Sequence, residues 1–401
     1  MLNKSKCIKI GLISVLIVLV VVCALALSKK GGKAEFRKNT DSKVLSTWDM
    51  DMTPKDKVIA SWDSFVKKDD MMYIYDGGMI FKWDYKSVDY RPACDNPTCD
   101  HKGDSCSAFF GDKYECVKYY NNHWIFVEKD DNKRYYLGYC DFNGQNRKRV
   151  LDISDDIQGL NHMIYIDIDD EKLYLNYNSV INCCNDDGEW ETKIRFCVIE
   201  YDVSLIGKDT SYSREILLCD DDKAWHLISL CDGRLVTDVP GTNKEIGVFG
   251  DCRLYYMNDM SFETIKGSYY VQLLSQGRYV SQENDGLMLV DNDKKIRLDD
   301  GGWGVAFCDD KRIYAINMYE RQMKYSEDKS VMPSAEVKVY DYEGNVVDHI
   351  YLPKDYSIIG SIAAYDGRYY LTNIDKYGGQ FFYVYDTQNP DKGWKKINRG
   401  Y

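Results

Sequence analysis

Four side chains that suit metal coordination or disulfide formation lie close together in the sequence. Cys94, Cys99, His101 and Cys106 fall within 13 positions. Three thiolates and one imidazole would complete the tetrahedral coordination that a structural zinc ion prefers. The spacing is not a standard zinc-finger spacing, so a disulfide between two of the cysteines, with the third free or paired with Cys116, is an equal alternative. A plain reduced loop is the third interpretation. In each case the predicted role is structural, because a closed Cys₃His site leaves no position open for catalysis.

Motifs for enzymatic chemistry are largely missing from the sequence. It contains no HExxH, no G-x-S-x-G and no Walker A loop, and Gly302-x-Gly304 lacks the third glycine of a dinucleotide site. We therefore predict no catalytic residue and no cofactor other than the structural zinc, and an enzyme is the less favoured interpretation. Paired carboxylates for glycoside hydrolysis stay open, because 64 acidic residues form many pairs whose distances a sequence does not reveal.

Two short patterns recur along residues 56–401, and both are typical of β-strands next to turns. The first is a polar turn that enters an aromatic or aliphatic strand, as in Asp232-Gly233-Arg234-Leu235-Val236. The second is an apolar strand that ends in Asp or Asn, at Asp84, Asp141, Asp202, Asn258, Asp291, Asp341 and Asp386. No later stretch shows helical periodicity, which argues against an α/β fold.

The second pattern recurs about every 50 residues, which is near the length of one blade in a kelch-type propeller. We therefore predict an all-β fold, a β-propeller of about seven four-stranded blades. The interval of 33 residues between Asn258 and Asp291 indicates a degenerate blade or a wrong register. We expect the strand at residues 381–386 and the segment before Met71 to complete one blade together, so that no sheet edge stays open. The Cys/His loop would then fasten the connection between the first two blades.

The N-terminus predicts attachment to a membrane. Residues 1–9 form a basic tail, residues 10–27 are an uncharged apolar stretch long enough to span a bilayer as a helix, and residues 28–55 are a polar tether to the propeller at residues 56–401. We favour an uncleaved signal anchor in the cytoplasmic membrane, with the propeller outside the cell. A cleaved signal peptide and a lipoprotein modified at Cys23 are alternatives.

Net charge argues against one class of partner, and the cysteine content bears on the redox environment. The formal net charge is −12, and such a surface repels phosphate backbones, so we expect no nucleic acid partner. Twelve of the 14 cysteines follow the apolar segment. They would form disulfides in an oxidising exterior or remain buried thiols in an anaerobic one. The second state suits five that lie in or beside apolar strands: Cys197, Cys219, Cys231, Cys252 and Cys308.

The apolar segment, the tether, the Asp-ending strands and the motif CDNPTCDHKGDSCSAFF at residues 94–110 together carry a resemblance. The chain resembles a group of uncharacterised, surface-anchored, propeller-like proteins of anaerobic Gram-positive bacteria, which are similar to TolB-like and WD40-like propellers. The resemblance implies a β-propeller outside the cytoplasm. It implies no particular activity and no catalytic residue.

Location and fold together suggest a function class. The sequence holds 34 Tyr and 8 Trp, and exposed aromatic side chains at a channel mouth could grip sugars or peptides. Most of them, however, are expected to fill the interfaces between blades. We predict a binding, sensing or interaction module for an extracellular glycan, peptide or protein ligand. An extracellular propeller enzyme acting on glycans and a structural assembly protein are the alternatives.

Overall fold

The computed structural model describes most of the chain between residues 42 and 397. The described ranges are 42–52, 66–69, 71–84, 90–169, 171–184, 188–209, 212–221, 225–239, 250–283, 285–292, 294–299, 303–308, 311–317, 336–352, 362–365, 367–374 and 380–397. Within these ranges no helix has the length and apolar character needed to cross a bilayer. The apolar stretch at residues 10–27 lies outside the described residues, so membrane attachment remains a prediction.

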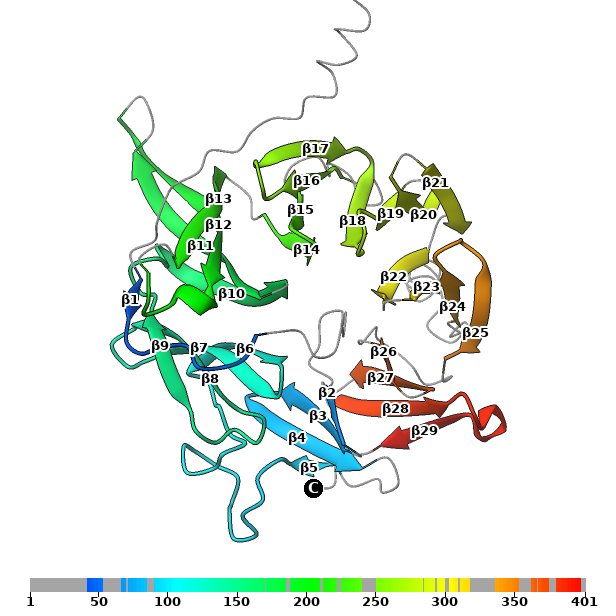
Figure 1. Cartoon of the computed structure of the whole chain (residues 1–401), viewed down its shortest axis with the longest axis horizontal. Helices are drawn as coiled ribbons and strands as arrows, with labels where there is room; N and C mark the ends of the chain where they lie inside the picture. Colours follow the sequence, from blue (N-terminus) through cyan, green and yellow to red (C-terminus); the bar gives the residue numbers. More distant parts are fainter. Residues whose placement is uncertain are drawn as a thin grey trace, which may run out of the picture.

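The described strands form seven antiparallel sheets arranged as a ring (Figure 1). Each sheet is one blade with four strands that are consecutive in the chain, and the sheet of blade 2 has a fifth strand from the N-terminal side. The first strand of each blade lies towards the centre of the ring and the fourth towards the outside (Figure 1). The predicted all-β propeller of about seven blades is therefore confirmed, with seven blades.

The blades have the following strands. Blade 1 comprises β2 (Val66–Lys68), β3 (Met71–Asp76), β4 (Met79–Asp84) and β5 (Arg91–Pro92). Blade 2 comprises β6 (Tyr114–Tyr120), β7 (His123–Lys129), β8 (Tyr135–Asp141) and β9 (Lys148–Asp152). Blade 3 comprises β10 (Leu160–Asp169), β11 (Lys172–Cys184), β12 (Trp190–Asp202) and β13 (Ser213–Asp221). Blade 4 comprises β14 (Leu227–Cys231), β15 (Arg234–Asp238), β16 (Cys252–Tyr256) and β17 (Ser261–Ile265).

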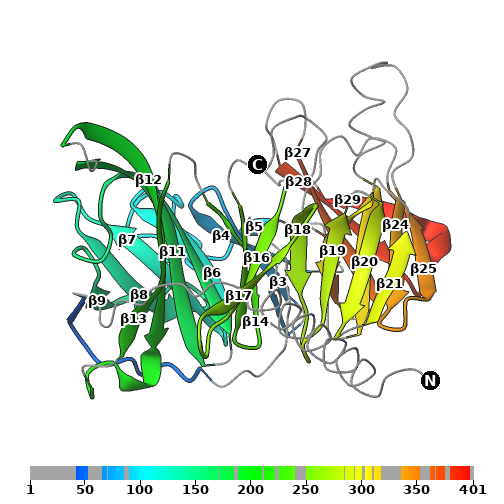
Figure 2. The same ribbon diagram turned by 90° about the horizontal axis from the view of Figure 1, so that it is seen from above.

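The second half of the ring repeats the plan. Blade 5 comprises β18 (Ser268–Leu273), β19 (Tyr279–Glu283), β20 (Gly286–Asp291) and β21 (Lys294–Asp299). Blade 6 comprises β22 (Trp303–Cys308), β23 (Arg312–Asn317), β24 (Glu336–Asp341) and β25 (Val346–Tyr351). Blade 7 comprises β26 (Ile362–Tyr365), β27 (Arg368–Ile374), β28 (Gln380–Asp386) and β29 (Trp394–Ile397). Two 3₁₀ turns, η1 (Val203–Leu205) and η2 (Pro390–Lys392), follow β12 and β28. Figure 2 shows the ring from the side, where the 13-residue strands β11 and β12 rise beyond most of their neighbours.

The turn residues explain why these segments form hairpins. Asp232 and Gly233, between β14 and β15, both have positive φ, as do Gln276 and Gly277 between β18 and β19. Two consecutive residues with positive φ make the type I′ turn, whose twist matches that of the flanking strands. The recurring polar turn is therefore the hairpin between the first and second strands of a blade.

The Asp-ending pattern marks the third strand of each of the seven blades. It ends β4, β8, β12, β20, β24 and β28 at an aspartate, and Asn258 lies two residues after β16. The short interval before Asp291 is neither a degenerate blade nor a wrong register. Blade 5 has four complete strands, and the interval is short because the turns around β17, β18 and β19 are short.

Ring closure differs from the prediction. β28 pairs with β27 and β29 of its own blade, whereas β2 pairs with β3. No described strand is thus shared between blades 7 and 1. The N-terminal strand β1 (Lys43–Val44) instead adds a fifth strand to the outer edge of blade 2, where it pairs with β9. It lies within the predicted tether, and the boundaries of tether and propeller remain predictions.

Among the described residues, side-chain packing joins blades 7 and 1. In the part of the chain that the structure describes, buried apolar residues form seven clusters, and each cluster joins two neighbouring blades. The cluster between blades 7 and 1 contains Trp83 and Tyr90 from one side and Tyr370 and Ile397 from the other. These aromatic side chains fill a blade interface, as expected from the sequence.

Candidate functional site

The predicted Cys/His residues lie in the long connection between β5 and β6, at the outside of the ring between blades 1 and 2 (Figure 1). The loop follows the turn between β3 and β4 closely. Ala108 accepts a hydrogen bond from the Ile80 amide at 2.9 Å, and the Phe110 amide donates to Gly78 at 2.8 Å. Phe109 forms an isolated β-bridge with Met79. The loop is therefore an added layer on blade 1.

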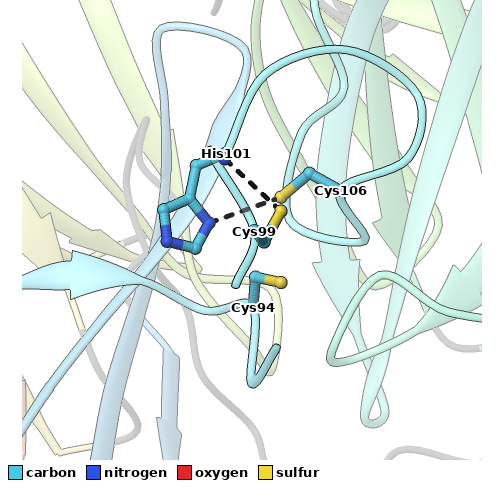
Figure 3. A group of neighbouring side chains, drawn as sticks. All are labelled: Cys94, Cys99, His101 and Cys106. Atoms are coloured by element: carbon cyan, nitrogen blue, oxygen red, sulfur yellow. Dashed lines mark hydrogen bonds between the residues drawn. The ribbon is translucent and has the colours of Figure 1, made fainter. Parts of the chain in front are cut away.

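The structure brings all four predicted ligands together. The three sulfurs and one imidazole nitrogen all lie within 4.8 Å of one another (Figure 3). The Cys106 sulfur is 3.7 Å from Nδ1 of His101. Cys106 is fully buried, and the other three residues are partly buried. All twelve described cysteines are free thiols, these three included.

Backbone amides surround the sulfurs. The amide of His101 donates to Cys99 Sγ at 3.3 Å. The backbone of Asn96 bonds Cys94, and the backbone of Ala108 bonds Cys106. Burial raises the pKa of the Cys106 thiol to about 12. Burial also opposes ionisation of Cys94, but the bonds from Asn96, Cys99 and Cys106 outweigh it and hold the pKa of Cys94 below its ordinary value.

Arg147, in the turn between β8 and β9, clamps the loop from the side of blade 2. Its Nη2 donates to the carbonyls of Ser107 and Phe109 at 2.7 and 2.6 Å. Its guanidinium also stacks over the Phe110 ring, with 4.2 Å to the centroid. Gly144, in the same turn, approaches so closely that a Cβ there would lie 1.9 Å from the Ser107 oxygen. The loop is held between a turn of blade 1 and a turn of blade 2.

A second candidate site is a pocket of about 810 Å³ at the turns of blades 3, 4 and 5. Its wall is made by hairpin turns on one end of the blades and is strongly charged. The charged residues in the wall are Asp169, Glu171, Lys172, Glu200, Asp202, Arg214, Asp232 and Arg234. Nothing in the sequence marks these residues as a group, because they come from the five strands β10, β11, β12, β13 and β15 and from two turns.

Glu200 is the best-connected group of the pocket. Its carboxylate is buried and accepts from Lys172 at 3.1 Å, from the Tyr174 hydroxyl at 3.0 Å and from Arg214 at 2.7 and 3.0 Å. Burial by itself would raise the pKa of Glu200, but Arg214 and Lys172 outweigh it and lower the pKa below the ordinary value. The network is built by register, because Tyr174 and Arg214 are the cross-strand partners of Glu200 in β11 and β13.

Aspartates in the hairpin turns tie blades 3, 4 and 5 together. Asp169 accepts from the amides of Asp232 and Gly233 at 3.1 and 2.9 Å, and Asp232 accepts from the amide of Gln276 at 2.7 Å. Arg234 also contacts blade 5, because its Nη2 donates a hydrogen bond to the Leu274 carbonyl at 2.6 Å. Asp169 and Asp232 lie near Cys231 in a group of metal-ligand type. Both oxygens of Asp169 already accept amide hydrogens, so we interpret the group as a contact between blades.

Comparisons with known proteins show similarity in fold and none in sequence family. No protein-family model matches the chain, and no curated protein matches its sequence. Among solved structures, puromycin hydrolase aligns with a TM-score of 0.50 and 10% identity, over 88% of this chain and 56% of its own. A puromycin-hydrolysing peptidase of Mycobacterium tuberculosis aligns with a TM-score of 0.44 and 11% identity, over 90% of this chain and 56% of its own. The β-propeller domain of the Trilobed protease from Pyrococcus furiosus aligns with a TM-score of 0.42 and 12% identity, over 72% of this chain and 85% of its own.

The chain thus spans little more than half the length of puromycin hydrolase. At this identity the likeness establishes the propeller fold. It confirms the fold implied by the sequence resemblance, while surface anchoring and the bacterial group stay predictions.

The comparisons correct the predicted function. We predicted a binding, sensing or interaction module, with a glycan-acting enzyme or an assembly protein as alternatives. The solved structure that aligns with the chain at a TM-score of 0.50 is described instead as a hydrolase. The sequence could not reveal this, because the likeness is carried by backbone geometry at about 10% identity.

Proposed function

We propose that this chain has a peptidase-related function, as the propeller that admits short peptides to hydrolysis. The observation that carries the proposal is the alignment of 88% of the chain with puromycin hydrolase. The proposal places the hydrolytic groups outside the described residues or in a partner. Within the described residues, each of the five histidines bonds a group other than a serine hydroxyl.

The pocket at blades 3 to 5 supports this function by its charge pattern. A short peptide carries an amine at one end and a carboxylate at the other. The wall offers Glu171 and Asp202 for the first, and Lys172, which also pairs with Glu200, for the second. Opposite charges at fixed positions would orient a peptide, since charged groups paired in a partly enclosed site attract more strongly than in bulk water.

Hydrogen exchange of the full chain, read by mass spectrometry, tests the proposal. Puromycin and trialanine are the peptide-like probes, and a neutral chitin trisaccharide is the comparison. We expect the peptide-like probes to slow exchange in the turns around Asp169, Asp202 and Asp232, and the sugar to leave it unchanged. Protection by the sugar alone, or by none of the probes, would overturn the proposed function.

A charge-reversal variant tests whether the peptide-like probes bind in this pocket or elsewhere on the surface. Glu171→Lys should reduce the protection at least several-fold, because this exposed wall carboxylate would no longer attract the peptide amine. Glu343→Lys is the matched control, because Glu343 is exposed in the turn between β24 and β25. Equal protection in the two variants would show that the peptides bind elsewhere.

A further inference from the structure

The Cys/His loop has a ligand geometry that fits one tetrahedral metal ion. Zinc–sulfur and zinc–nitrogen bonds of about 2.3 and 2.05 Å place sulfur and nitrogen ligands about 3.6 Å apart, and two sulfur ligands about 3.8 Å apart. The distance from Cys106 Sγ to His101 Nδ1 is 3.7 Å. The remaining ligand atoms lie within 4.8 Å of one another, which requires only small rotamer adjustments to reach these edges.

Backbone groups contact all three cysteine sulfurs of the cluster. Each sulfur is bonded by the backbone two residues further on, from Asn96, His101 and Ala108 respectively. Hydrogen bonds from the backbone fix the position of each sulfur, as in a ligand site that its surroundings hold in place. The same arrangement at three separate positions indicates that the loop is shaped around its sulfurs.

The loop is also held in place by its own backbone conformation and by neighbouring ion pairs. His101 and Gly103 both have positive φ, which folds the chain back so that His101 faces Cys106 (Figure 3). Lys82 forms an ion pair with Asp95, next to the first ligand. Lys113 forms another with Asp104 at 2.9 Å. A site held in place by its surroundings loses little entropy on binding, which increases affinity.

A disulfide explains fewer of these features than a metal ion does. It would join two sulfurs and leave the third cysteine and His101 without a role. A four-ligand metal ion uses every member of the cluster. Thiolate and imidazole ligands in a closed tetrahedron favour Zn²⁺ among the abundant divalent ions.

We propose that Cys94, Cys99, His101 and Cys106 bind one structural zinc ion that fastens the first blade to the second. The ion would sit beside the buried cluster that joins these blades, to which Cys94, Cys99 and Cys106 contribute. This inference is independent of the peptidase-related function, because the loop and the pocket belong to different blades.

Metal analysis of the full chain tests the inference. We expect about one zinc ion per chain after purification without chelator. Replacement by cobalt should give the intense visible absorption of a tetrahedral site together with sulfur-to-cobalt charge transfer. A chain without zinc that cannot take up cobalt after thiol reduction would overturn the proposal. A peptide map with a disulfide between two of these cysteines in the freshly purified protein would also overturn it.

Matched variants keep the test valid if removal of a cysteine prevents folding. His101→Asn removes the imidazole while keeping a residue type that tolerates positive φ, so the loop should still form. We expect it to lose the bound zinc or to hold it at least 10-fold more weakly. Cys184→Ser, an exposed cysteine outside the group, should keep the full zinc content. Full zinc retention in His101→Asn would contradict the four-ligand site.

Discussion

At the scale of single residues, the side chains that matter most differ in how visible they are in the sequence. The four Cys/His ligands are close in sequence and of rare types, so their pattern could be recognised. Glu200 is one of 64 acidic residues, and nothing local marks it as buried. Its role arises from cross-strand pairing with Tyr174 and Arg214, which depends on the register of three strands.

The buried Glu200 network predicts a pH-dependent stability. The pKa of Glu200 is lowered in the folded protein, so its contribution is complete above the ordinary value of 4.5 and is lost as the pH falls through the folded pKa. Glu200→Gln should cost about 1.5–3 kcal/mol near neutral pH, because the hydrogen bonds from Arg214 and Lys172 lose their ionic partner. This difference from the wild type should shrink as the pH falls below about 4.

Urea unfolding of both proteins at a series of pH values measures the difference. Glu343→Gln, at an exposed turn position, is the control and should follow the wild type throughout. A cost that stays constant between neutral and acidic pH would show that Glu200 acts by its shape and not by its charge.

At the scale of elements, the Asp-ending strands are a reliable signal because the terminal aspartate accepts hydrogen bonds from the following turn in more than one blade. Asp341 Oδ1 accepts from the amides of Glu343 and Asn345, and Asp386 Oδ1 accepts from the amide of Gln388. These bonds set the turn to the outer strand. The partners of the Cys/His loop could not be predicted, because the turns containing Gly78 and Gly144 contact it only through the tertiary fold.

A substitution at Gly144 tests the close contact between this turn of blade 2 and the Cys/His loop. Gly144→Ala should destabilise the protein by at least about 2 kcal/mol, because φ is +76° and the added Cβ would collide with the Ser107 carbonyl. Gly188→Ala is the matched control, with φ +83° but no atom within 4 Å of its Cβ, and should cost only about 1–2 kcal/mol. Thermal unfolding of the two variants gives the comparison, and equal losses would refute the close contact.

At the scale of the whole molecule, the blade count could be predicted but the way the ring closes could not. The count follows from a repeated local pattern. Closure depends on whether a strand from one end of the chain finds a partner at the other end, which no local pattern determines. The structure uses packing between blades 7 and 1, with Trp83 and Ile397 buried in the shared cluster.

Closure by packing predicts where the ring opens first when that interface is weakened. Ile397→Ala should cost about 2–5 kcal/mol and should speed hydrogen exchange mainly in β2 to β5 and β26 to β29. Ile350→Ala, in the cluster between blades 6 and 7, should cost a similar amount but speed exchange in those two blades. Faster exchange spread evenly over all blades in the first variant would argue against closure by the packing between blades 7 and 1.

The zinc-held joint between blades 1 and 2 is tested most directly by X-ray absorption at the zinc edge of the full chain. The account predicts three sulfur ligands at about 2.3 Å and one nitrogen ligand at about 2.0–2.1 Å, with no oxygen in the first shell. In His101→Asn that still holds some zinc, the nitrogen contribution should be lost while the three sulfurs remain. A first shell made of oxygen and nitrogen, or of fewer than three sulfurs, would contradict the assignment of Cys94, Cys99, His101 and Cys106 as ligands.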